Sequence, residues 1–276
     1  MANHIRSISM PSTSHPTIIR IQEELENLMA RIASSRTAQI VPDGLKSVGD
    51  VYEQIEELIR LPSSQQSILL CRKKWIEEQL DCSLRLLDLI GAARGSLVSM
   101  REHVQDLQLA IRRKGNQVNE SKKKAQKIIK DSLKSLKLMS GKNVSCCIED
   151  NSNQLDKVLA EARESTISLL SSIFSFLSKT KTKTKRWSIV SKAISKRKVA
   201  CEGEFEVATA QENIDMWLQV SYDCILSKEV NAMMVEKAHN DLQAMEDRME
   251  ILESGLEFLF RKLIQNMVSL LNILSL

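Results

Sequence analysis

The 276-residue sequence is short of the residues that make tight turns. It has 8 glycines and 4 prolines, and aromatic residues make up only 4% of the chain. An all-β fold needs turn residues at each of its many hairpins, so this scarcity excludes one. The chain is instead rich in Leu, Lys, Glu, Met, Gln and Ala, which lose little side-chain freedom in a helix.

Long apolar runs are also missing. The best candidate, residues 167–177, has eleven positions, four of them serine, whereas a helix needs about 20 apolar residues to cross a bilayer. Residues 1–20 are polar and lack the apolar core of a secretory signal. We therefore expect a cytoplasmic protein, with the nucleus as the other compartment, in which the six cysteines act mostly as small apolar side chains.

Groupings that carry chemistry are absent from the sequence as well. The histidines His4, His15, His103 and His239 are far apart, and we expect single surface residues. No cysteines have C-x-x-C spacing, and no glycine-rich loop could cradle a phosphate. The sequence predicts no catalytic, cofactor-binding or metal-ligating residue and no small-molecule substrate, so we expect a protein that is not an enzyme.

Apolar residues recur at helical spacing, most clearly near the C-terminus. There they alternate by three and four positions, as in a coiled-coil seam: Leu242, Met245, Met249, Leu252, Leu256, Leu259 and Leu263. We expect the last four to pair this helix with another. Met267, Leu270 and Leu274 would continue the seam after a shift of one residue.

A second heptad run comes earlier in the chain and consists of Leu97, Met100, Val104, Leu107 and Ile111. It follows a stripe that the sequence assigns to Leu80, Leu84 and Leu87. Gly91 and Gly95 lie between the two runs and are expected to loosen the chain. Nearer the N-terminus, residues 42–44 (Pro-Asp-Gly) are expected to break the helical pattern.

Long helices with short connections predict an all-α fold. We expect an elongated antiparallel bundle of amphipathic helices with a coiled-coil-like C-terminal helix. The sequence divides into a disordered Ser/Pro leader over 1–16, a helical bundle over 17–178, and a basic Lys/Thr connection over 179–186. A helical C-terminal part over 187–276 would pack on the same bundle.

Five segments carry a further signal. They are HIRSISMPS (4–12) with SHP (14–16), LPSSQQ (61–66), LDCSLRLLD (80–88), RRK (112–114), and ESGLE (253–257) continuing to LLNIL (270–274). In this order they resemble a plant-specific family of helical proteins described as Bypass-like. The resemblance implies no established enzymatic activity and no known cofactor. It implies a link to root and shoot development and supplies no site residues.

The leader holds one candidate regulatory motif. Arg6, Ser9 and Pro11 have the R-S-x-S-x-P form that 14-3-3 proteins read once the second serine is phosphorylated. A phosphate on Ser9 would add charge and acceptor oxygens suited to an arginine cluster on such a partner. The other reading is that short strings of Ser, Arg and Pro arise often in flexible leaders.

A basic segment follows in the second half of the chain. Residues 179–198 hold nine Lys or Arg and no acid, clustered at Lys183, Lys185 and Arg186 and again at Lys196, Arg197 and Lys198. Residues 199–276 hold fourteen acids against five bases. The basic segment is read as a solvated or intramolecular surface, a nuclear import signal, or a membrane-surface helix with Trp187 on its apolar side. One aromatic among the bases argues against nucleic acid.

Two functions remain open at this level. The first is a non-enzymatic helical scaffold or adaptor that presents helix faces to a protein partner. The second is a peripheral membrane protein held at an anionic surface by the segment around Trp187.

Overall fold

The computed structural model describes residues 15–34, 40–70, 73–113, 154–178, 221–225 and 232–275, with Leu218 and single positions between 123 and 134. Within these ranges the chain is helical and holds no strand, which confirms the predicted all-α fold. The leader up to residue 14 and residues 179–217 lie outside the described residues, so the expectations for them are not tested. The division into four parts therefore stays a prediction.

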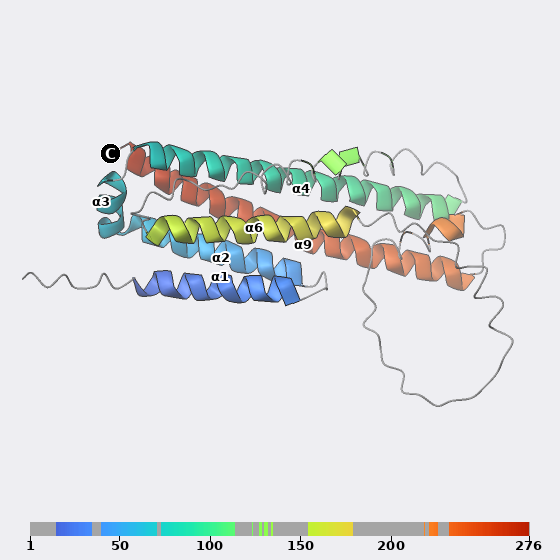
Figure 1. The fold of residues 1–276 in the computed structure, drawn as a ribbon. Helices are drawn as coiled ribbons and strands as arrows, with labels where there is room; N and C mark the ends of the chain where they lie inside the picture. The colour runs from blue at the N-terminus through green and yellow to red at the C-terminus, as the bar shows by residue number, and fades with distance from the viewer. Residues whose placement is uncertain are drawn as a thin grey trace, which may run out of the picture.

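The described helices follow the chain as α1 (Pro16–Ser34), α2 (Ile40–Arg60), α3 (Pro62–Leu70), α4 (Lys73–Arg113), α6 (Gln154–Ser178) and α9 (Ala232–Leu274). The bundle is elongated, and α4 and α9 run side by side along its length (Figure 1). They have 41 and 43 residues. At 1.5 Å per residue each is about 60 Å long.

The helices do not overlap over their whole length. α2 and α6 lie against one half of the α4–α9 pair, the half where α3 lies and α9 ends, and α1 packs on α2 and α6 (Figure 1). α4 and α9 then continue together past the ends of these three helices (Figure 1). The C-terminal half of α9 therefore has both α2 and α4 as neighbours, whereas its N-terminal half runs along α4.

α2 and α9 pack closely against each other, and each helix contributes a glycine to the contact. A Cβ atom on Gly49 of α2 would overlap the ring of Phe258, and one on Gly255 of α9 would lie 3.0 Å from Cδ1 of Leu45. Both approaches are closer than ordinary van der Waals contact. The missing side chains therefore let the two backbones come together around Phe258 and Leu45.

Two expected interruptions of the helices do not occur. α2 begins at Ile40, so residues 42–44 form its first turn, where a proline has no intrahelical hydrogen bond to lose. Gly44 faces α6, and a Cβ atom there would lie 2.6 Å from Cδ2 of Leu169. α4 runs without a break through Gly91 and Gly95, since a helix tolerates isolated glycines at a cost of about 1 kcal/mol each.

The stripe assigned to Leu80, Leu84 and Leu87 is also displaced. Leu84 is 52% exposed, and Leu80 and Leu87 are only partly buried. The buried face of this part of α4 is formed by Ile76, Cys82, Leu86, Leu89, Ile90 and Ala93. The three leucines flank that face because helical spacing alone does not say which of two neighbouring stripes turns inward.

The seam of α9 follows its predicted positions and then departs from them. Leu252, Leu256, Leu259 and Leu263 are at most 5% exposed. The seam then continues without a shift through Asn266, Leu270 and Ile273, all buried, and Met267 is only partly buried. Asn266 Nδ2 donates to the backbone oxygen of Tyr52 at 2.6 Å and to that of Lys262 at 3.1 Å. The predicted shift was wrong because a polar residue occupies a seam position.

Candidate functional site: an acidic groove between α4 and α9

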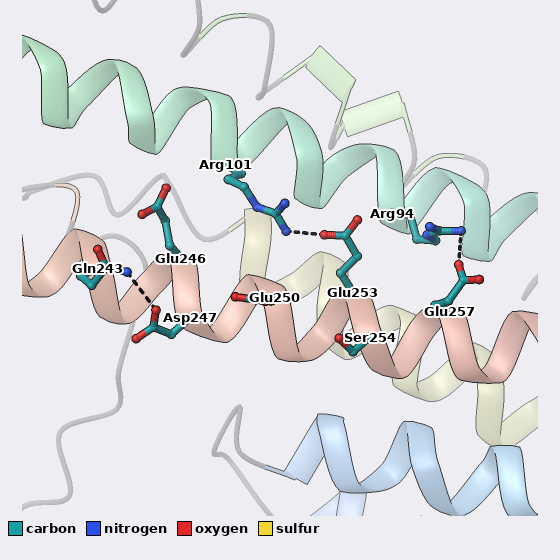
Figure 2. A pocket seen from close by; sticks show the side chains of 9 residues that line it. All are labelled: Arg94, Arg101, Gln243, Glu246, Asp247, Glu250, Glu253, Ser254 and Glu257. Atoms are coloured by element: carbon teal, nitrogen blue, oxygen red, sulfur yellow. Dashed lines mark hydrogen bonds and ion pairs between the residues drawn. The ribbon is translucent and has the colours of Figure 1, made fainter.

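A groove of about 680 Å³ follows the outer side of the α4–α9 pair. Its walls carry five carboxylates and two guanidinium groups (Figure 2). The lining residues are Arg94, Arg101, Gln243, Glu246, Asp247, Glu250, Glu253, Ser254 and Glu257. A smaller groove of about 400 Å³ lies near the end of the pair where α4 ends and α9 begins, and its lining includes Gln108, Glu236 and His239.

Helical spacing places these residues on facing flanks. Glutamates at 246, 250, 253 and 257 step by four, three and four, so they lie in one row beside the buried seam of α9. On α4, Arg94, Arg101 and Gln108 are seven residues apart and form the opposite row. These are the positions at which paired helices ordinarily place interhelical charges.

Three contacts connect the two rows, and a fourth lies within α9 beside them. Arg94 Nη1 lies 2.7 Å from Glu257 Oε2, and Arg101 pairs with Glu253 (Figure 2). Gln108 Nε2 donates to Glu246 Oε2 at 3.1 Å, and Gln243 Nε2 donates to Asp247 Oδ1 at 3.0 Å. The ion-paired side chains are about one-third exposed. Because water screens such pairs, each contributes only about 0.2–1 kcal/mol to the stability of the fold.

The groove carries an excess of negative charge. Five carboxylates against two guanidinium groups leave a formal charge of −3 on its lining. Glu250 is exposed on this row, between Glu246 and Glu253. A groove lined by one sign of charge attracts groups of the other sign and speeds their association. The arrangement therefore suits a cationic partner.

The geometry does not resemble a catalytic or metal centre. Across the described parts of the chain, no three His, Cys, Asp or Glu side chains are grouped so that they could hold a metal ion. The groove acids are spread along about three turns of one helix, from 246 to 257. Acids spread in this way can contact an extended surface but do not converge on a single atom.

A second polar group lies inside the bundle, between α4 and α6. Gln79 Oε1 accepts from Arg163 Nη1 at 2.5 Å, and Gln79 Nε2 donates to Asp156 Oδ1 at 3.0 Å. Trp75 Nε1 donates to the same Asp156 oxygen at 3.2 Å. The amide of Gln79 therefore connects the guanidinium to the carboxylate. Neither groove described above is lined by these residues, so we interpret them as fixing how α4 and α6 pack.

Tyr52 of α2 lies close to this polar group. Burial raises the pKa of Tyr52 to about 12, and the hydroxyl of Thr166, 3.4 Å from its own, and the charge of Arg163 counter that effect only in part. The phenol is therefore protonated at neutral pH. It acts as a buried hydrogen-bonding side chain.

His103 contradicts the expectation of a surface histidine. It is 2% exposed, and its Nε2 lies 2.7 Å from the hydroxyl of Tyr222. Burial raises the pKa of that tyrosine. This contact fixes residues 221–225 against α4. Sequence spacing could not reveal it, because 119 positions separate the two residues.

The residues singled out from the sequence fall into two groups. Arg6, Ser9 and Pro11 lie outside the described residues, as do the basic clusters at 183–186 and 196–198, so their roles stay predictions. Leu252, Leu256, Leu259 and Leu263 lie in the buried seam, the first two alongside the groove residues and the last two beyond them. The sequence reasoning missed the acidic row, although its four-three-four spacing beside the leucine seam was a usable signal.

Comparisons with known proteins give one match. No curated protein and no solved structure matches the chain. None of the described helices is long and apolar enough to span a membrane.

The family described as Protein BPS1 matches residues 44–273, which covers α3, α4, α6, nearly all of α9 and most of α2. This match confirms the resemblance seen in the sequence, and the chain belongs to the BPS1 family.

Proposed function

We propose that this protein is a non-enzymatic helical scaffold that binds a protein partner through the acidic groove between α4 and α9. The observation that supports this most directly is the unbalanced charge of the groove, five carboxylates against two guanidinium groups. The root and shoot development implied by the family resemblance is a process in which such a scaffold would act, in the cytoplasm or the nucleus.

A basic segment of the partner would fit the groove physically. Each added Lys or Arg would make a solvent-exposed ion pair worth about 0.2–1 kcal/mol, so several are needed for specific binding. Such pairs raise the association rate and select the partner more than they raise affinity. Binding should therefore weaken as salt rises, since the Debye length is about 8 Å at physiological ionic strength.

Charge reversal in the groove tests the proposal. Each Glu→Lys change adds two positive charges, so Glu246→Lys with Glu250→Lys takes the lining from −3 to +1. We expect affinity purification from the protein's own tissue to lose a defined set of partners with this double variant. Glu57→Lys, on the exposed surface of α2 and outside the groove, is the matched control. An identical partner set for all three proteins would contradict the proposal.

The leader offers a separate partner. Phosphorylation of Ser9, with Arg6 and Pro11 beside it, would create a 14-3-3 motif. A phosphorylated peptide of residues 1–16 should bind a 14-3-3 protein, and the unphosphorylated peptide should not. Equal binding by the two peptides, or none by either, would remove this partner without affecting the groove.

The second candidate function is attachment to a membrane surface. The sequence observation in its favour is residues 179–198, with nine bases and Trp187. We expect co-sedimentation with anionic vesicles that falls with salt and is lost when Lys196, Arg197 and Lys198 are changed to Ala. Equal sedimentation with neutral vesicles would contradict it.

A further inference from the structure

The acidic row of α9 continues as an apolar row on the same flank of the helix. Glu257, Ile264 and Leu271 are seven residues apart, which on a helix means nearly the same direction. Val268 lies between the last two. Ile264, Val268 and Leu271 are 39%, 48% and 44% exposed, and they do not belong to the buried seam, which runs through Leu263, Asn266, Leu270 and Ile273.

The facing row of α4 changes character in the same way. Arg101, Arg94, Leu87 and Leu80 are also seven residues apart. The Arg94–Glu257 pair fixes the register of the antiparallel helices, so Leu87 lies level with Ile264 and Leu80 level with Leu271. Leu80 and Leu87 are partly buried against the core, and Leu84 beside them is 52% exposed.

One continuous face therefore has two parts. We call the part around Glu246–Glu257 the acidic half, and the part formed by Ile264, Val268 and Leu271 with Leu80, Leu84 and Leu87 the apolar half. From 246 to 271 the face follows 26 residues of α9, about 38 Å at 1.5 Å per residue. Exposed apolar residues are common singly, but here they lie in line and adjoin a charged groove.

We propose that this face binds a single partner helix that is basic in one half and apolar in the other. The helix would lie along the groove between α4 and α9, with its Lys and Arg side chains on the acidic half and its apolar side chains on Ile264, Val268 and Leu271. This inference rests on the proposed function and specifies the chemistry of the partner.

Charge favours a helix over two other occupants. An anionic membrane surface would be repelled by the five carboxylates that adjoin the apolar half. A second copy of the chain would place acids against acids in a parallel arrangement, or acids against apolar side chains in an antiparallel one. A helix with basic and apolar halves satisfies both parts of the face at once.

The test uses the full chain and a synthetic helix-forming peptide of about 26 residues, with Lys and Arg on one face of one half and Leu and Ile on the same face of the other. Binding is measured by fluorescence anisotropy. We expect Val268→Ser to weaken binding about fivefold, because the variant loses part of the apolar area that the valine would bury against the peptide. Glu250→Lys should weaken it by a similar factor at low salt and by less at high salt.

Two matched controls separate the face from general effects. Ile251→Ser removes another apolar residue of α9 that is 53% exposed but lies off this face, and Glu57→Lys reverses a charge on α2. Both should change affinity by less than about 1.5-fold, as expected for residues that the peptide does not touch. A peptide of the same composition with its bases and apolar residues mixed along the whole length should bind more weakly than the two-part peptide.

Several outcomes would overturn the inference. No binding, an equal loss in Ile251→Ser, or no loss in Val268→Ser would each do so. If charge reversal still removed partners in the tissue experiment, the acidic groove would keep its proposed function and the apolar half alone would fail. Vesicle binding that depends on Val268 would assign the face to a membrane. A doubled mass in solution that Val268→Ser abolishes would assign it to a second copy.

Discussion

The two halves of α9 use the same leucine seam but are held differently. In the C-terminal half, α2 and α4 both pack against the helix, and two polar contacts to α2 are buried: Asn266 to the Tyr52 backbone, and Ser269 to Glu56 at 3.3 Å. Along α4, from Glu246 in the N-terminal half to Glu257 just past the middle of α9, the contacts are part-exposed ion pairs and a hydrogen bond from a side-chain amide. The comparison indicates that stability concentrates where α2 lies, and that the flank along α4 is held by weaker, partly exposed contacts.

The largest expected effect comes from a charge placed in the seam. Leu256→Asp, at a position with no exposed surface, should lower the free energy of unfolding by at least about 3 kcal/mol, because it buries an unpaired carboxylate. Met245→Asp, equally buried but in the N-terminal half, should lower it by less. Chemical denaturation followed by circular dichroism measures both. Equal losses would remove the distinction between the halves.

High pH should weaken the half that α2 supports. The pKa of Tyr52 is raised from 10.0 to about 12, so the folded state holds its proton more tightly than the unfolded state. The contribution of Tyr52 to the free energy of unfolding is therefore fully present below pH 10. It is lost as pH rises toward 12, by about 2 kcal/mol at pH 12. Tyr52→Phe lacks this loss. Unfolding curves are compared at pH 9 and pH 12 for the parent chain and for Tyr52→Phe. An equal loss of stability in both would contradict the assignment of this loss to Tyr52.

Two glycines should respond to alanine with opposite signs. Gly49→Ala places a Cβ against the ring of Phe258 and should destabilise the chain by about 1–2 kcal/mol. Gly91 of α4 has open space around it, so Gly91→Ala should stabilise by about 0.5–1 kcal/mol through helix propensity alone. Thermal unfolding of the two variants beside the parent chain tests this. Destabilisation by both would mean that the outer side of α4 is also tightly packed.

The smallest expected effect concerns ion pairs. A double-mutant cycle on Arg94 and Glu257, both about one-third exposed, should give a coupling of about 0.2–1 kcal/mol that disappears in high salt. The pair of Lys262 and Glu53, at 2.7 Å with Lys262 only 15% exposed, should keep more of its coupling. A larger, salt-resistant value at Arg94 would mean that the contacts to α4 hold α9 at least as firmly as those to α2.

The sequence was sufficient for the helical class and for most of the seam, because leucines that recur at alternating intervals of three and four residues are typical of helices packed against helices. It did not predict the residues whose polarity differs from that expected at their position in the fold. Asn266 is a seam residue that no hydrophobic pattern could include, and its place depends on a backbone oxygen of α2 more than 200 positions away. Leu84 is the converse, an apolar residue that helical spacing assigns to a stripe although the fold leaves it exposed.

The groove was harder to foresee for a different reason. Acids beside a leucine seam are common on solvated helices, so the spacing of Glu246–Glu257 marks one row of charges but does not show that α4 faces it. The choice of α4 as neighbour depends on the packing of the whole bundle. The buried connection from Arg163 through Gln79 to Asp156 likewise joins residues 84 and 77 positions apart, which a single sequence does not reveal.

The order of the two longest helices along the chain also affects how the protein is made. α4 ends at Arg113 and α9 begins at Ala232, so 118 residues must be translated between them. At about 5–20 residues per second the ribosome takes roughly 6–24 s for this stretch. During that time the apolar sides of α2 and α4 lack the helix that covers them, and the nascent chain should depend on chaperones until α9 leaves the exit tunnel.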